Sequence, residues 1–301
     1  MLARDFTDGE ILNAFSQMDL CKAPGIGGLS SCFFKENWEV VGKGVLKLCH
    51  DVLDGNKDIS YLNDTMIILI PKTKEPNDMT NFRPISLCRV IDKIISEVLA
   101  NRLKEALPLC ISQNQCAFVP SHIIHDNILI AHELIHYLQS SKNGPNKGFV
   151  IKLDMSKAYD RVDRNFLEKV TKKLGFEDTW VDKILRSIRS IRYVVKCNMV
   201  LSKIIILERG LRQGDPLSPY LFLFCMEAFS RMLLHAQRTN VIRGIRASQN
   251  DPHINHLLFV DDTLLFVRNK KVKLRPFLNI LGESAQAWGQ SINLDKSMVF
   301  F

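Results

Sequence analysis

The stretch FVIKLDMSKAYD, residues 149–160, joins a run of apolar residues to a carboxylate. The run at 149–153 is short and almost wholly apolar, so we predict a buried β-strand that ends at Asp154. A second stretch, LLFVDDTLLFV at 257–267, places Asp261 and Asp262 between two short apolar runs. This pattern predicts a β-hairpin with carboxylates at its tip. A strand end and a hairpin tip of this kind would together form an oxygen-rich cluster.

Such a cluster has a plausible chemistry. Adjacent carboxylates repel one another unless a cation neutralises them, and hard oxygen ligands favour Mg²⁺. Two such ions can activate a 3′-hydroxyl and stabilise a departing pyrophosphate. The alternative is that Asp261 and Asp262 are a solvated turn dipeptide, and the residues alone leave both interpretations open.

Outward from these stretches, predicted helices and strands are interleaved, which indicates a mixed α+β fold. A polar loop at 140–148 is the one candidate boundary between subdomains. The other predicted elements are helices within 1–60, strands in TMIILIPK (65–72) and FRPISL (82–87), helices at 91–107 and 126–139, helical segments up to about 191, extended segments at 192–197 and 204–207, and a helix at 219–238.

The composition fits a folded protein: of 301 residues, 46% are hydrophobic and 24% charged. No apolar run is long enough for a bilayer span, and the N-terminus lacks the apolar core of a signal peptide. Eight scattered cysteines without a CxxC pair favour a reducing compartment, so we expect a nuclear or cytoplasmic protein. The net charge is +8, and residues 157–212 hold 14 Lys and Arg against 7 Asp and Glu. This excess favours a polyanionic partner, although a solvated basic helix face would explain it equally well.

Seven motifs follow one another along the chain: LIPK, FRPISL, NQCAFVP, KLDMSKAYDRV, GLRQGDPLSPYLF, FVDD and INLDKS. In this order they closely resemble the reverse transcriptase domain of LINE-type (non-LTR) retrotransposons, especially the branch abundant in plants. The resemblance implies a right-hand polymerase fold. It also implies a helical lead-in over 1–60 and a reverse transcriptase domain over 61–301, with fingers to about 146 and a palm over 147–301.

The resemblance assigns roles to the palm residues. Asp154 and Asp261 match the ligands shared by two Mg²⁺ ions, for which Mn²⁺ is a possible substitute, and Asp262 matches the neighbouring acid. Lys296 in NLDKS matches the late palm lysine, placed to protonate or neutralise the pyrophosphate.

Five further residues match the family's nucleotide-binding positions. Tyr159 matches an aromatic steric gate that fills the space of a ribose 2′-hydroxyl. Lys72 and Arg83 match the fingers cations that grip the triphosphate. Gln213 and Gly214 match the segment that lies against the nucleotide and template.

The resemblance therefore implies an RNA-directed DNA polymerase that takes an RNA template, a DNA primer and dNTPs. Because Phe301 follows the last palm motif closely, we expect the thumb and the endonuclease and RNase H-type regions of many relatives to be missing. A catalytically silent, nucleic-acid-binding remnant is the main alternative.

The sequence departs from the family's usual pattern at three places. Ile26 and Gly27 stand where Pro-Asp usually follows KAPG, and Ser121 and His122 stand where Gly-Arg usually follows AFVP. A hairpin glycine that commonly follows the asparagine at 198 is replaced by Met199.

One motif points to a different chemistry. His132, Glu133 and His136 spell HExxH on a predicted helix, which in isolation suggests a zinc metalloprotease. The same spacing is expected of a plain amphipathic helix whose other half is apolar. No HxxGxxH extension follows, so a zinc ion would lack an obvious third ligand.

Overall fold

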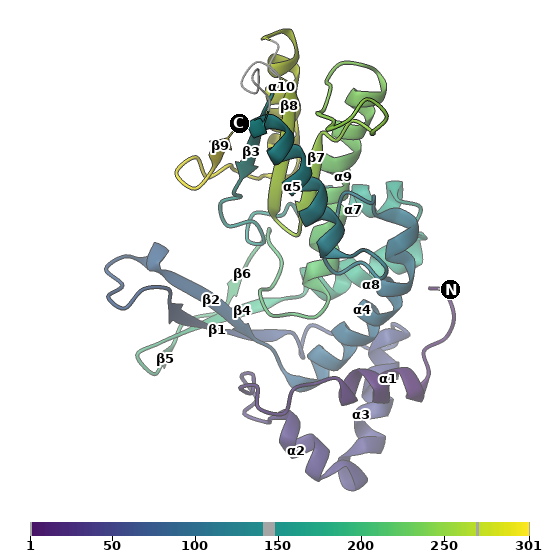
Figure 1. The fold of residues 1–301 in the computed structure, drawn as a ribbon. Coiled ribbons are helices and arrows are strands. Elements are labelled where there is room, and N and C mark those ends of the chain that lie inside the picture. Colours follow the sequence, from purple (N-terminus) through teal and green to yellow (C-terminus); the bar gives the residue numbers. More distant parts are fainter. Residues whose placement is uncertain (1, 141–147, 269–270, 301) are drawn as a thin grey trace. The chain divides into compact units, whose positions relative to one another are not determined.

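The computed structural model describes residues 2–140, 148–268 and 271–300 (Figure 1). The fold is mixed α+β, as predicted, and it divides into two compact units. The first unit comprises Met1–Leu103 and Thr171–Pro219, and the second comprises Lys104–Val170 and Tyr220–Phe301. The predicted boundary between fingers and palm, near residue 146, lies outside the described residues and stays a prediction.

The first helix of the first unit, α1, lies in the N-terminal segment that was predicted to be helical. Thr7 and Glu10 form a reciprocal capping box at the start of α1, and the buried guanidinium of Arg102 binds both carboxylate oxygens of Glu10 at 2.9 Å. These contacts fix α1 by satisfying its free N–H groups and by pairing its acid. The helices that lie wholly within this unit are α1 (Asp8–Ser16), α2 (Ser31–Glu36), α3 (Trp38–Leu53) and α8 (Asp178–Arg189).

The sheet of the first unit is built around β1 (Asp64–Pro71). β1 pairs antiparallel with β2 (Phe82–Leu87) and parallel with β4 (Arg192–Cys197). The strands predicted in TMIILIPK and FRPISL are therefore confirmed as β1 and β2. The short strands β5 (Val200–Leu201) and β6 (Ile205–Ile206) pair with β4. The chain between β1 and β2 contains only the 3₁₀ turn Met79–Asn81.

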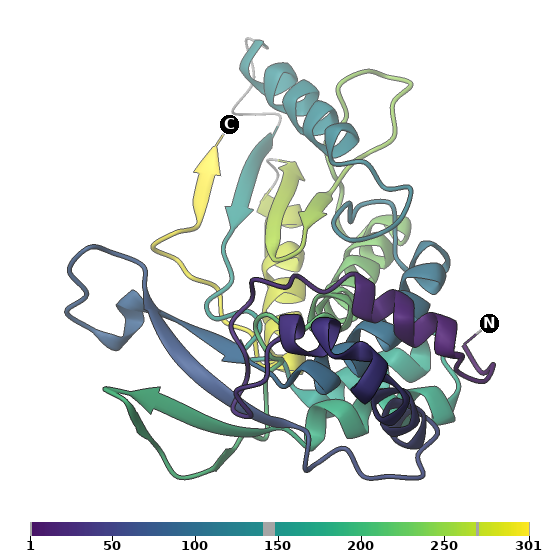
Figure 2. The same ribbon diagram turned by 90° about the horizontal axis from the view of Figure 1, so that it is seen from below.

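The sheet of the second unit has the order β7-β8-β3-β9 (Figures 1 and 2). The predicted strand is β3 (Gly148–Leu153), and the predicted hairpin is β7 (His256–Phe259) with β8 (Asp262–Arg268). β3 lies between β8 and β9 (Met298–Phe300) and is antiparallel to both. Asp154 therefore follows the end of β3, and Asp261 lies in the turn that leads into the neighbouring strand β8.

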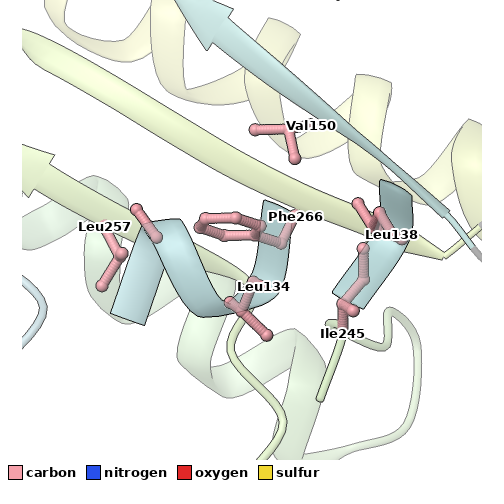
Figure 3. Packing of buried hydrophobic residues seen from close by; sticks show 7 residues of the cluster. Leu134, Leu138, Val150, Ile245, Leu257 and Phe266 are labelled. Atoms are coloured by element: carbon pink, nitrogen blue, oxygen red, sulfur yellow. The ribbon is translucent and has the colours of Figure 1, made fainter. Parts of the chain in front are cut away.

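Helix α5 (Ile124–Ser140) packs on this sheet through one apolar face (Figure 3). Leu134 and Leu138 contact a core that includes Val150 of β3 and Phe266 of β8. Burial of this face removes apolar surface from water and fixes the rotation of the helix. Four more helices complete the described fold: α4 (Val90–Cys110), α7 (Arg164–Lys173), α9 (Ser218–Arg238) and α10 (Lys271–Trp288). Among the described residues, no helix is long and apolar enough to cross a membrane.

Candidate active site

The three predicted metal-binding acids lie at one end of the sheet of the second unit. Phe259 pairs with Asp262, so the turn between β7 and β8 consists of Val260 and Asp261 alone. Leu153 is the register partner of Thr263, so Asp154 leaves β3 beside the start of β8. Antiparallel pairing of β3 and β8 thus brings together acids that are more than 100 positions apart in the sequence.

These carboxylates influence one another electrostatically. The pKa of Asp261 is raised, chiefly because the side chain is partly buried and also because Asp262 and Asp154 carry like charges. A divalent cation would offset this repulsion, and three carboxylates are the hard oxygen donors that Mg²⁺ prefers. The acids therefore fit a cation in their chemistry.

The side chains are not gathered into a ligand shell. Within the part of the chain that the structure describes, no three His, Cys, Asp or Glu side chains are placed to hold an ion together. The carboxylate of Asp262 lies 3.9 Å from the ammonium group of Lys152, across the strand pair. Metal binding would require the carboxylates to converge, and Asp262 would have to leave this exposed ion pair.

A turn at 293–297 fixes Asp154 from the other side of β3. The backbone N–H of Asn293 donates to the carbonyl of Asp154 at 2.9 Å, and the N–H of Asp154 donates to the hydroxyl of Ser297 at 3.2 Å. Lys296 belongs to this turn, and its side chain is exposed. The predicted lysine is therefore carried by the segment that binds both backbone groups of Asp154.

Gln115 fixes the turn between β7 and β8, a role that the sequence analysis missed. Val260 has a φ of +55°, a left-handed conformation that is unusual for a β-branched residue. The buried side-chain amide of Gln115 brackets it: Oε1 accepts from the N–H of Val260 at 3.1 Å, and Nε2 donates to its carbonyl at 3.4 Å. The motif NQCAFVP contains this glutamine, but nothing in the sequence indicates what it contacts.

Tyr159 lies on a column of aromatic rings. Its ring stacks on Phe222 with centroids 4.9 Å apart, and Phe222 in turn contacts Trp288. Burial, together with the charge of Asp261, raises the pKa of Tyr159 to about 12. The side-chain amide of Gln290 donates to the carbonyl of Ala158 at 2.8 Å and holds the preceding residue. The ring is thus rigidly placed near Asp261 and stays protonated.

The other predicted nucleotide-binding residues belong to the first unit. Lys72 follows β1 and its ammonium group donates to the carbonyl of Thr80 at 3.0 Å, within the loop before β2. Arg83 is exposed on β2 opposite Ile70 of β1. The carbonyl of Gln213 accepts from the N–H of Ser86, also on β2. β2 thus carries Arg83 and holds the segment of Gln213.

Gly214 has a φ of +93°, which an L side chain rarely adopts, so this position favours glycine. The segment around it is anchored by the buried side chain of Arg212, another residue that the sequence analysis did not select. Its guanidinium donates to Asp92 at 2.6 Å and to Asp215 at 3.3 Å. Asn63 also accepts from this guanidinium, at 2.7 Å.

The HExxH residues lie on the outer face of α5. His132, Glu133 and His136 are exposed, whereas Leu134 and Leu138 are buried against the sheet. The amphipathic helix accounts for the motif. Among the described residues, no third His, Cys, Asp or Glu joins the two histidines in a metal-binding group.

Comparison with known proteins identifies the family. Residues 70–301 match the family described as reverse transcriptase (RNA-dependent DNA polymerase). The chain belongs to this family. Its relatives include reverse transcriptases of non-LTR retrotransposons, as the order of its motifs predicts.

Two relatives and one solved structure illustrate the similarity. This reverse transcriptase domain is 27% identical over 268 residues to the transposon TX1 149 kDa protein of Xenopus laevis, covering 89% of the chain and 20% of that protein. It is 27% identical over 231 residues to the Pol polyprotein of the retrotransposable element R2 of Popillia japonica, covering 76% of the chain and 31% of that protein. Apo telomerase of Candida tropicalis has the same fold, with a TM-score of 0.53 and 15% identity over 80% of the chain and 50% of the telomerase. The chain therefore spans about a fifth to a third of these two relatives.

Proposed function

We propose that this reverse transcriptase domain is an RNA-directed DNA polymerase that adds deoxynucleotides to the 3′ end of a primer. The observation that carries the proposal is the placement of Asp154, Asp261 and Asp262 at one end of a sheet, where burial and then the like charges of the other two acids raise the pKa of Asp261. The family match over residues 70–301 supports the same reaction.

Members of this family generally use divalent metal ions. We propose that Asp154 and Asp261 hold two Mg²⁺ ions, with Asp262 as the neighbouring acid and Mn²⁺ as a substitute. Bound there, the ions would activate the attacking hydroxyl and stabilise the leaving pyrophosphate. The protein's own contribution is to fix the carboxylates, through Gln115 at the hairpin turn and the turn at 293–297.

Two further site residues of the second unit, Tyr159 and Lys296, act on the incoming nucleotide and on the pyrophosphate that leaves it. The rigid ring of Tyr159 excludes a ribose 2′-hydroxyl by steric clash. The exposed side chain of Lys296, within the turn that binds Asp154, neutralises or protonates the pyrophosphate.

We also propose nucleotide-binding roles for four residues of the first unit. Lys72 and Arg83 bind the triphosphate as cations, and the glycine at 214 allows close approach of the backbone to the nucleotide. Gln213 lies with it against the nucleotide and template. The partners that this function requires are an RNA template, a DNA primer and dNTPs, in the nucleus or the cytoplasm.

The test is primer extension on an RNA template with the purified chain and Mg²⁺. Asp261→Asn should abolish extension while the protein remains folded, because one metal-binding carboxylate is lost. Asp182→Asn, which alters an exposed acid of the first unit in the same way, should extend like wild type. Extension by Asp261→Asn at the wild-type rate would refute the assignment.

The second candidate function is a nucleic-acid-binding remnant without catalysis. The departures at Ser121 and Met199 favour it, because both residues have left-handed backbones where relatives usually have glycine. Wild-type protein that binds primer and template but adds no nucleotide, with Mg²⁺ or Mn²⁺, would establish this function and exclude the polymerase.

A further inference from the structure

A cavity of about 370 Å³ opens in the second unit, away from the three acids. It lies among the chain that connects α9 to β7, the end of α5 and the end of β8. β8 begins at Asp262 and ends at Arg268, so about 20 Å of extended strand separates the acids from this cavity. Its lining includes Tyr137, Arg246, Ser248, His253 and Arg268.

The connecting chain that forms most of the cavity wall is firmly anchored. Ile245 and Ile254 exchange two backbone hydrogen bonds of 2.9 and 2.8 Å. Ile245 is buried in the same core as Leu138 of α5 (Figure 3). The side chain of Gln237 binds both sides of the connection, accepting from Gly244 at 3.2 Å and donating to His253 at 2.7 Å. The cavity is therefore built into the fold.

The cavity carries positive charge. Arg246 and Arg268 line it, and one nitrogen of the Arg246 guanidinium donates to the carbonyl of Gln249 at 2.6 Å. Beside them, Arg243 donates to Nε2 of His253 at 3.2 Å. The connection at 239–255 contains one acid, Asp251, whose carboxylate accepts from the backbone N–H of Ser248. The described residues that line the cavity include no acid.

The state of His253 shows how these charges act together. A guanidinium can only donate, so Nε2 accepts from Arg243, and Nδ1 holds the proton that is donated to the carbonyl of Gly244 at 3.2 Å. Burial lowers the pKa of His253, and the charges of three arginines lower it further. Those arginines are Arg243, Arg246 and Arg268. All three guanidinium charges therefore act on His253, which lines the cavity.

We propose that this cavity binds phosphate groups of an RNA strand, outside the polymerase centre. The planar guanidinium matches a phosphate through two parallel hydrogen bonds, and each neutralised phosphate releases counterions. Three arginines spread over the connection and the end of β8 suit successive phosphates of a strand better than one small anion. The choice of RNA rests on the proposed function, whereas the cationic cavity does not.

The test measures binding of a short fluorescent single-stranded RNA by anisotropy, in EDTA, over a series of salt concentrations. Arg246→Gln/Arg268→Gln should bind at least fivefold more weakly than wild type. Two lost phosphate contacts should also reduce the slope of log K against log salt by about 1.4. The matched control, Arg238→Gln/Arg275→Gln, removes the same charge from two exposed arginines outside the cavity.

Equal binding by the cavity variant and the control would overturn the proposal. Competition at constant ionic strength separates the possible sources of phosphate. Inorganic phosphate and dNTPs should fail to displace the RNA at millimolar concentration, and displacement by either would show that the cavity is a site for a small anion instead.

Chemical footprinting tests the site in the wild-type protein, so its result does not depend on whether a variant folds. RNA should protect Arg246 and Arg268 from modification by phenylglyoxal but leave Arg238 reactive, and equal reactivity with and without RNA would refute the site. Asp261→Asn separates this proposal from the polymerase function, because it should lose extension yet keep the same RNA affinity in EDTA.

Discussion

The side-chain amide of Gln115 holds the peptide groups on both sides of Val260, with hydrogen bonds of 3.1 and 3.4 Å. Val260 precedes Asp261 in a two-residue turn and has a left-handed backbone. Such a conformation costs on the order of 1 to 3 kcal/mol and persists where neighbouring groups hold it. Gln115 is thus positioned to determine where the carboxylate of Asp261 points.

Gln115→Leu should reduce primer extension by at least about tenfold and raise the Mg²⁺ concentration needed for half-maximal rate. The turn would lose both hydrogen bonds, and Asp261 would no longer be fixed. The measurement is an Mg²⁺ titration of extension rate. Gln113→Leu is the matched control, since Gln113 is exposed two residues away. An unchanged Mg²⁺ requirement in Gln115→Leu would show that the turn keeps its conformation without the side chain of Gln115.

Tyr159→Ala should raise incorporation of ribonucleotides relative to deoxynucleotides by at least about tenfold, because removal of the ring frees the space of a 2′-hydroxyl. The measurement is single-nucleotide extension on an RNA template with dNTP and rNTP in parallel. Tyr159→Phe keeps the ring that stacks on Phe222 and should keep the wild-type ratio. A wild-type enzyme that already prefers ribonucleotides would remove Tyr159 from this role.

His256 should make the protein less stable in acid. Its imidazole is fully buried and bonded to the hydroxyl of Ser230 at 2.8 Å, and burial lowers its pKa from 6.5 to about 3. Below pH 6.5 His256 binds a proton in the unfolded chain, whereas in the folded chain it stays neutral down to about pH 3. The contribution of His256 to the free energy of unfolding is therefore intact above pH 6.5 and declines as the pH falls from 6.5 to about 3.

Between pH 7 and pH 5, His256 should therefore account for a loss of about 2 kcal/mol in the free energy of unfolding. Urea denaturation at both pH values tests this, with His256→Gln as the variant and the exposed His132→Gln as the control. His256→Gln should lose correspondingly less stability than wild type over the same interval. Parallel losses in all three proteins would show that His256 titrates normally.

Met199→Gly should stabilise the protein. Cys197 pairs with Val200, so Asn198 and Met199 form a two-residue turn with φ values of +48° and +65°. Turns of this type favour Asn-Gly because both residues are left-handed. Glycine should raise the free energy of unfolding by about 0.5 to 1 kcal/mol.

Met199→Ala is the control for that turn, because it removes the exposed side chain but keeps the Cβ that causes the strain. Thermal or urea unfolding of the three proteins should rank glycine above wild type and place alanine beside wild type. A glycine variant no more stable than the alanine variant would show that the backbone at 199 is unstrained.

The sequence by itself determined the elements that carry the acids. A short apolar run before Asp154 and two apolar runs around Asp261 are local patterns, and local patterns decide whether a segment forms a strand or a hairpin. The order of the seven motifs was also sufficient to indicate the family, which the match over residues 70–301 confirms.

Only the tertiary structure decided which side chains support the predicted site residues. Gln115 and Val260 are 145 positions apart, and Arg212 and Asp92 are 120 apart. Contacts at such separations depend on strand register and helix rotation, which no local pattern specifies. The same holds for the HExxH motif, because its spacing is compatible with a zinc site and with an amphipathic helix. The packing of Leu134 and Leu138 on the sheet places the two histidines of the motif on the outer face of the helix. Burial of apolar area sets that rotation, because the opposite rotation of the helix would expose the leucines to water and bury the polar histidines.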